Sequence, residues 1–137
     1  MELKEIIEDF EFIDEWDDRY KYIMDIGKSL DPMSEGDHND KNKVDGCASQ
    51  VWLITEEKNI NEKSILEFKA DSDSFLVKGL LAIIIAIFSM KTPEDILKID
   101  HLAELKKLNL QENISQQRSN GLRAVITRVI SEAQKRV

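Results

Sequence analysis

The stretch Phe75-Leu-Val-Lys-Gly-Leu-Leu-Ala-Ile-Ile-Ile-Ala-Ile-Phe88 decides the fold of this 137-residue chain. After Gly79 it is apolar on every side, which is typical of a helix buried in the middle of a domain. Its β-branched residues would also suit a strand, but the run is too long for one. We therefore predict a central helix from about Ser74 to Met90, with Gly79 as a point of close approach between helix and sheet.

The residues that precede this helix have the pattern of a small sheet. Val51 to Thr55 is a β-branched and aromatic run, and Ile65 to Ala70 alternates apolar with polar residues. The polar segment 56–64 suits a hairpin connection, and a short third strand fits around residues 43–45. An antiparallel sheet of about three strands needs a helix on its apolar face to be stable.

Further helices are predicted at both ends of the chain. Apolar residues at three- and four-residue spacings indicate helices over residues 2–12 and 14–30, with Asp14 as the cap of the second. Later caps are expected in Asp71-Ser72-Asp73, at Thr92, at Asp100 and at Ser115, and Leu102, Leu105 and Leu108 are expected to face inward. With no repeat and no domain boundary, residues 1–137 form one α+β domain with the sheet packed against helices.

Composition narrows the classes of function. Residues 1–75 hold 21 acidic and 9 basic residues, a net charge of −12, whereas residues 76–137 hold 6 and 10, a net of +4. The acidic half would repel phosphate backbones, so no nucleic-acid partner is expected. The longest apolar run, Leu80 to Phe88, is far below the ~20 residues that span a bilayer, so no membrane is expected either. With a charged N-terminus and one cysteine, we expect a cytoplasmic protein.

The chemistry is expected at Val44-Asp-Gly-Cys-Ala-Ser-Gln-Val-Trp52, which contains the only cysteine. Cys47 follows the long polar segment 31–43, which is rich in turn-forming residues and predicts a surface loop. A lone cysteine is most often a small buried hydrophobe. Here Gly46 precedes it and small polar residues such as Ser49 follow it, which favours a thiol that a partner can reach.

Three kinds of chemistry are open to this thiol. A metal site would have to combine Cys47 and His38 with an acid, which is a poor set beside the several thiolates or imidazoles of ordinary sites. A cysteine hydrolase would need a base, for which His101 is the only reasonable residue. An accessible thiol without a base fits a carrier that receives sulfur from a persulfide by thiol–disulfide exchange chemistry.

The Cys47 motif resembles the signature of the SufE family of sulfur-acceptor proteins, in which a valine, a Gly-Cys pair, a serine and a Val-Trp pair recur. The resemblance continues in the same order over nearly the whole chain. It includes four further segments: Trp16 to Lys28, Ala70 to Leu80, Thr92 to Ile96 and Arg118 to Leu122. Five motifs in register make the resemblance specific.

The resemblance implies a fold shared with iron–sulfur scaffold proteins and a defined activity. Proteins of this family accept sulfur from a pyridoxal-phosphate cysteine desulfurase, stimulate that enzyme and pass the sulfur to an iron–sulfur scaffold. Cys47 matches the accepting cysteine, Arg118 is the basic residue expected near its loop, and Asp73 lies in a segment associated with partner contact. No prosthetic group is expected in this chain, and the sequence leaves a homodimer open.

Two alternatives stay beside this reading. An iron–sulfur scaffold of related fold is disfavoured because one thiolate cannot hold a cluster that normally needs several cysteines. The hydrolase built on Cys47 and His101 depends on the two side chains meeting in the fold.

Overall fold

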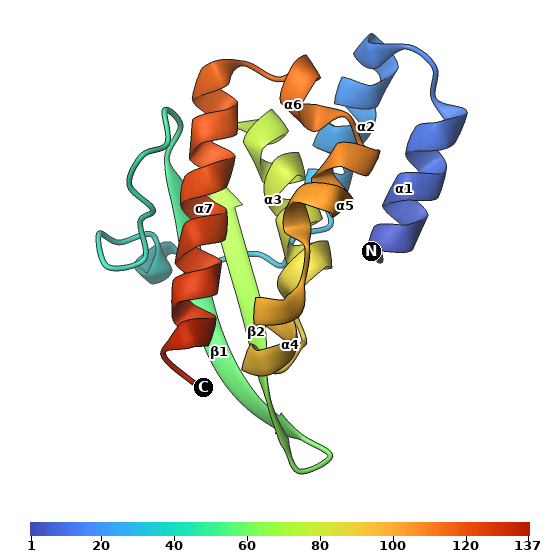
Figure 1. Cartoon of the computed structure of the whole chain (residues 1–137). Coiled ribbons are helices and arrows are strands. Elements are labelled where there is room, and N and C mark those ends of the chain that lie inside the picture. The colour runs from blue at the N-terminus through green and yellow to red at the C-terminus, as the bar shows by residue number, and fades with distance from the viewer.

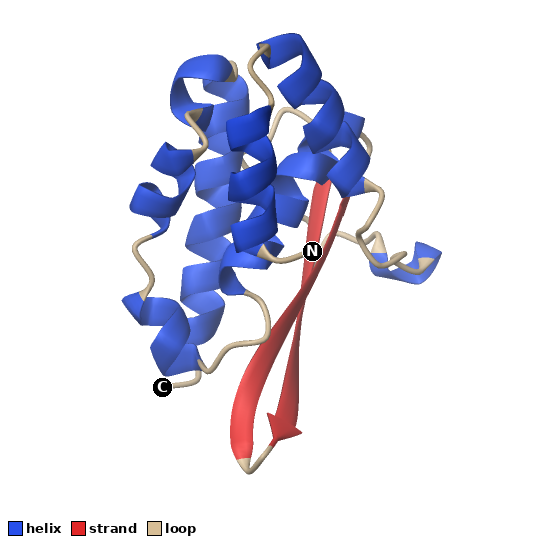
Figure 2. Cartoon of the chain, turned by 90° about the vertical axis from the view of Figure 1, so that its right-hand side faces the viewer, coloured by secondary structure: helices blue, strands red, loops and turns tan.

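The apolar stretch that follows Ser74 forms a helix, α3 (Phe75–Phe88), at the centre of the molecule. The Ser74 hydroxyl accepts a hydrogen bond from the Val77 N–H and so caps the helix. The computed structural model describes residues 1–137 and has the predicted α+β architecture, with helices packed against an antiparallel sheet (Figures 1 and 2). Its remaining elements are α1 (Leu3–Phe12), α2 (Trp16–Gly27), a 3-10 helix (Glu35–Asp37), β1 (Val51–Ile60), β2 (Lys63–Ser72), α4 (Pro93–Lys98), α5 (His101–Lys107), α6 (Leu110–Asn113) and α7 (Gln116–Gln134).

The sheet has two strands, so the expectation of about three was wrong. β1 and β2 pair antiparallel from Val51↔Ser72 to Ile60↔Lys63. The expected third strand is reduced to a single bridge between Lys43 and Trp52. Residues 41–42 before it and residues 45–46 after it lie in turns, so the extended backbone that a strand needs is interrupted on both sides.

The hairpin is longer and its turn shorter than the polar segment 56–64 suggested. Only Asn61 and Glu62 lie between the strands, and both have positive φ (52° and 66°), as a two-residue hairpin turn of matching twist requires. The ribbon projects beyond the helices at this end (Figure 1), so both of its faces meet water and the apolar alternation disappears. The loss of pattern marked the end of helix cover rather than the end of the strand.

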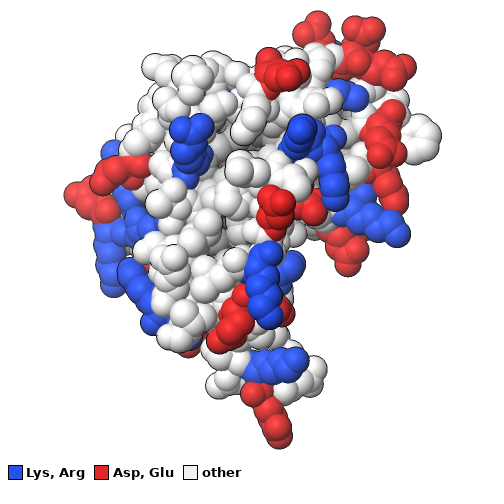
Figure 3. Space-filling view, viewed as in Figure 1, with Lys and Arg blue, Asp and Glu red and all other residues white.

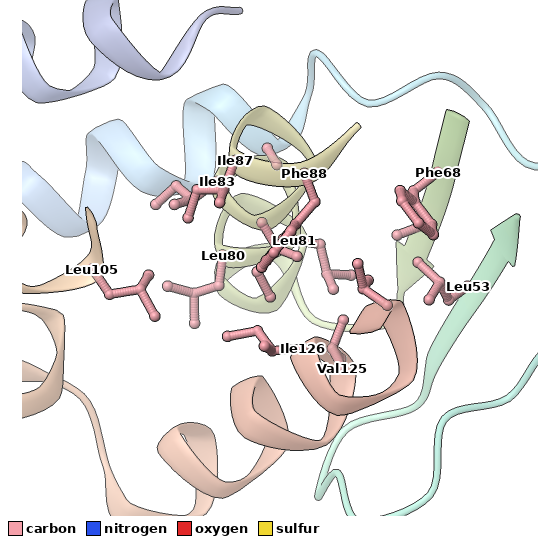
Figure 4. Packing of buried hydrophobic residues seen from close by; sticks show 14 of the residues in the cluster. Leu53, Phe68, Leu80, Leu81, Ile83, Ile87, Phe88, Leu105, Val125 and Ile126 are labelled. Atoms are coloured by element: carbon pink, nitrogen blue, oxygen red, sulfur yellow. The ribbon is translucent and has the colours of Figure 1, made fainter. Parts of the chain in front are cut away.

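The core lies between α3, the sheet and α7. Leu80 and Leu81 of α3 point toward Val125 and Ile126 of α7, and the strands contribute side chains such as Phe68 (Figure 4). All five are buried. Burial of one such side chain contributes roughly 1.5–3 kcal/mol, so this cluster fixes how α7 lies relative to the sheet.

Gly79 is a point of close approach, but to α2 rather than to the sheet. A Cβ atom at Gly79 would lie 1.9 Å from the carbonyl oxygen of Ile23, and one at Gly27 would lie 2.7 Å from the Gly79 nitrogen. The two glycines face each other where the helices cross.

The predicted helix starts were partly right. The side chains of Thr92, Asp100 and Ser115 cap α4, α5 and α7 as expected. Asp14 caps nothing, because α2 begins after Glu15 without a side-chain cap. Leu102 is 58% exposed and not inward, since α5 is a short surface helix that buries Leu105. No helix combines the length and the apolar character that a bilayer span requires.

Candidate functional site

Cys47 lies in a segment that we call the cysteine loop, residues 39–50, which leads into β1. The thiol is half-buried and packs on α7, where its Sγ lies 3.6 Å from the carbonyl oxygen of Gly121, to which it donates. A Cβ atom at Gly121 would be 3.4 Å from Sγ. A side chain larger than alanine at that position would therefore push the thiol away from the helix.

Gly46 gives the loop the backbone shape that this placement needs. Its φ of 93° lies in the region that L side chains rarely adopt, and a Cβ there would lie 3.4 Å from the Cβ of Ala124 on α7. The glycine therefore serves both the turn and the close passage of the loop over the helix.

Replacing Gly46 by alanine is expected to lower the free energy of unfolding by about 1–2 kcal/mol, the cost of forcing a Cβ into the left-handed region. Urea unfolding measures the change. Gly36→Ala is the matched control, because nothing lies within 4 Å of a Cβ at Gly36 and its φ is not positive. Equal stability of the two variants would contradict the assigned strain.

A pocket of about 380 Å³ opens beside Cys47, between the cysteine loop and the first halves of α3 and α7. Ala48 and Ser49 line it from the loop and Gln117 and Arg118 from α7. The interior is apolar and is made by Val51, Val77, Leu80, Leu81, Leu122 and Val125. A small uncharged or weakly hydrated group bonded to Sγ can be held there away from water.

Arg118 lies on the rim of this pocket. The family resemblance led us to expect a basic residue near the cysteine loop, and Arg118 lines the same pocket as residues 47–49 of that loop. Its side chain is exposed, and it forms neither an ion pair nor a side-chain hydrogen bond, so no local acid neutralises it. Its backbone N–H donates to the capping hydroxyl of Ser115, which leaves the side chain uninvolved. The guanidinium group is therefore free to meet an anion at the pocket mouth.

Asp73 lies on the other side of the loop and does not cap α3. Its carboxylate accepts a hydrogen bond from the Gln50 N–H (3.0 Å), and its own N–H donates to the Gln50 carbonyl (3.3 Å). This reciprocal pair joins the end of the cysteine loop to the junction of β2 and α3. Asp73 is exposed, so its free oxygen faces solvent.

The environment of Cys47 keeps its thiol protonated. Burial raises the pKa of Cys47, and the negative charge of Asp45 raises it further. Because the thiolate is the nucleophile, the thiol at rest is protected from adventitious oxidants and electrophiles.

Alkylation of Cys47 by iodoacetamide is therefore expected to rise with pH through a midpoint above about 8.5, the ordinary value for a cysteine. Asp45→Asn should lower this midpoint, since it removes the second cause of the shift. Asp40→Asn, an exposed change in the same loop, should not. A midpoint at or below the ordinary value in the unaltered chain would contradict the assignment.

Neither histidine that was considered as a partner of Cys47, His38 for a metal site or His101 for a hydrolase, lines the Cys47 pocket. His38 Nε2 bonds to Asp71 Oδ2 (2.6 Å), and its ring packs edge-on against Trp52 at 4.6 Å. His101 lines a second pocket, of about 400 Å³, between α5, α6 and α7, and its ring lies 5.9 Å from that of Phe88. The structure thus does not bring His101 into the lining of the Cys47 pocket. No group of three or more His, Cys, Asp or Glu side chains is arranged to hold a metal ion.

Two sets of contacts around the cysteine loop were not expected from the sequence. Asp71 pairs with Lys78 (3.4 Å) as well as His38. Burial acts to raise the pKa of Asp71, but the hydrogen bond with His38 and the charge of Lys78 outweigh it, so the pKa lies below its ordinary value. Arg128 of α7 reaches the loop backbone. No local pattern signals the contact of His38 with Asp71 or of Arg128 with the loop, because these partners are 33 to 87 residues apart.

Comparisons with known proteins match nearly the whole chain to the SufE family, the family that its motifs resemble. The sequence profile of the SufE family, described as an Fe-S metabolism associated domain, matches residues 4–133. An uncharacterised SufE-like protein of Rhizobium meliloti is 48% identical over 135 residues, which cover 98% of this chain and 96% of that protein. A second from Rhizobium etli is 45% identical over 134 residues, with 98% and 90% covered.

One solved structure supports the fold independently of close sequence similarity. The solution structure of a hypothetical protein from Thermus thermophilus superposes with a TM-score of 0.72 at 16% identity, covering 97% of this chain and 93% of the other. The likeness shows the shared fold. The family profile and the two relatives show that the chain belongs to the SufE family, which is associated with iron–sulfur metabolism.

Proposed function

We propose that Cys47 is a sulfur acceptor, which takes the outer sulfur of a persulfide on a pyridoxal-phosphate cysteine desulfurase and passes it on to iron–sulfur cluster assembly. The observation that carries this proposal is the placement of the only cysteine at the mouth of an apolar pocket with an unpaired arginine on its rim. Membership of the SufE family supports a role in sulfur transfer. Pyridoxal phosphate belongs to the partner, and the proposal needs no prosthetic group in this chain.

The transfer is a displacement at sulfur and involves no net oxidation. The Cys47 thiolate attacks the outer sulfur of the partner's cysteine persulfide, and the bond between that sulfur and the partner's cysteine breaks. A new S–S bond forms at Cys47, the partner's cysteine leaves as a thiolate, and the proton of Cys47 goes to solvent or to a base of the partner. Removal of the outer sulfur returns the desulfurase to its free form, so under this proposal the chain would stimulate that enzyme.

Each feature of the site has a place in this step. The high pKa of Cys47 keeps the resting thiol unreactive, so activation has to come from the docked partner, which brings either a base or positive charge. After transfer, the pocket has room for the extra sulfur atom and is lined mainly by apolar residues that exclude water and soluble thiols. The unpaired guanidinium of Arg118 is available to the persulfide anion.

Intact mass spectrometry tests the proposal directly. The chain is incubated with a cysteine desulfurase loaded with pyridoxal phosphate and with free cysteine, and the expected product carries one added sulfur that dithiothreitol removes. Protein alkylated at Cys47 beforehand is the control and should gain none. Failure of the unmodified chain to gain sulfur, while the desulfurase releases alanine, would overturn the proposal.

A further inference from the structure

The cysteine loop is attached to the sheet along one side only. Near its start, the Asn42 carbonyl accepts from the Leu53 N–H and the Val44 N–H donates to the Val51 carbonyl, each at 2.8 Å. Around such a bridge, successive carbonyls point to opposite sides of the chain. The Lys43 carbonyl therefore faces away from β1, and it and the carbonyl of Lys41, in the turn before the bridge, both lie within reach of α7.

Arg128 supplies donors for these two outward carbonyls. Its Nη2 donates to the Lys41 carbonyl at 3.0 Å and its Nη1 to the Lys43 carbonyl at 3.5 Å. A guanidinium group presents such donors in a rigid planar fork, which suits two acceptors two residues apart. One side chain of α7 thus takes the place of a third strand along this edge.

The same face of α7 also lies against residues 46 and 47 of the loop. Gly121 contacts Cys47, and the Ala124 Cβ lies 3.4 Å from where a Cβ of Gly46 would be; these two residues precede Arg128 at helical spacings of seven and four. Glu132, one turn beyond Arg128, lies 3.6 Å from its Nε and is only 15% exposed. Basic side chains gather on the side where the loop and α7 lie, next to a smaller acidic group, and most other acidic side chains lie over α1 and α2 (Figure 3).

We propose that Arg128 is a positioning residue whose guanidinium group clasps the cysteine loop to α7, and that opening of this clasp sets how fast Cys47 becomes reachable by a large partner. The inference rests on the proposed function, because only a sulfur acceptor has to present Cys47 to another protein. When the clasp opens, two bridge hydrogen bonds and the Gln50–Asp73 pair still hold the loop at its ends. The segment around Cys47 can then lift from Gly121 without unfolding of the domain.

The test compares alkylation of Cys47 by a bulky maleimide and by small iodoacetamide. In Arg128→Gln the rate with the bulky reagent is expected to rise about tenfold, because hydrogen bonds from a charged group are lost, and the rate with the small reagent is expected to rise less. Arg128→Lys keeps the charge without the fork and should give an intermediate rate. Arg123→Gln, an exposed change on α7 that removes no loop contact, is the matched control.

A merely structural role for Arg128 predicts a different pattern. Loss of stability alone would lower the melting temperature without moving the pH midpoint of Cys47 alkylation, whereas an open clasp should lower that midpoint by relieving burial. Should Arg128→Gln not fold, Arg128→Lys takes its place. Wild-type rates in the folded Arg128 variants, or an equal rise in Arg123→Gln, would overturn the clasp.

Sulfur transfer measured on the same proteins separates the two proposals. Faster alkylation of Arg128→Gln without sulfur acceptance by any of the chains would overturn the proposed function alone. Sulfur acceptance by the unaltered chain with no change in alkylation would overturn the clasp alone.

Discussion

Cys47→Ser is expected to abolish sulfur acceptance completely and to change the free energy of unfolding by less than about 1 kcal/mol. The chain has one cysteine, so no other residue can form the S–S bond that stores the sulfur. Serine is close in size to cysteine, and its hydroxyl can still donate to the Gly121 carbonyl that Sγ meets at 3.6 Å. The site should therefore keep its shape and lose only its chemistry.

Two measurements on the same variant separate chemistry from folding. Intact mass after incubation with the desulfurase and cysteine reports sulfur, and urea unfolding reports stability. Binding of the variant to the desulfurase should persist, because the surface around residue 47 is unchanged. Sulfur retained by the serine variant would place the acceptor elsewhere and defeat the proposed function.

Gly79→Ala is expected to lower the free energy of unfolding by about 3 kcal/mol or more, among the largest effects of a single methyl group in this domain. The added Cβ would lie 1.9 Å from the Ile23 carbonyl oxygen and 2.4 Å from Ile23 Cγ2. The carbonyl belongs to the backbone of α2, so no side-chain rotation relieves the overlap and the helices have to separate. Alanine favours a helix by only about 1 kcal/mol over glycine, which does not offset that separation.

Urea unfolding measures this change in the free energy of unfolding. Gly36→Ala is the control for a glycine in open space, and its free energy of unfolding is expected to lie within about 0.5 kcal/mol of that of the unaltered chain. Because α3 also lines the Cys47 pocket through Leu80 and Leu81, the Gly79 variant should lose sulfur acceptance in parallel with its folded fraction. A fully stable Gly79→Ala would mean that α2 and α3 do not cross as closely as described.

Much of the fold was predictable because its signals are local. Several elements are predicted by residues that lie within or next to them. Examples are the fully apolar run after Gly79, the β-branched start of β1, and the capping residues Thr92, Asp100 and Ser115. The strand count and the hairpin length were not predictable in this way. Pairing of Lys43 with Trp52 and the extension of the ribbon depend on what covers each segment, which no local pattern records.

The candidate site also has features that the sequence could predict and features that depend on packing. Cys47 and Gly46 stand out in the sequence by residue type and context, and the resemblance to the SufE family pointed to Arg118 and Asp73. The contacts of Arg118 with the pocket and of Asp73 with Gln50 come from packing of α3 and α7 against the loop. The role of Arg128 had no sequence signal, since an arginine on the polar side of a helix is ordinary.

The sequence by itself determined that this chain has a buried central helix, a small sheet and one thiol at a loop junction. Hydrophobic periodicity depends on residues close together in the chain and cysteine content on composition, so both can be recognised without a structure. Only the tertiary structure decided that Gly79 faces α2, that Cys47 rests on Gly121, and that Arg128 holds the loop. Such contacts join residues 56 to 87 positions apart, and their geometry is set by how whole elements pack in the core.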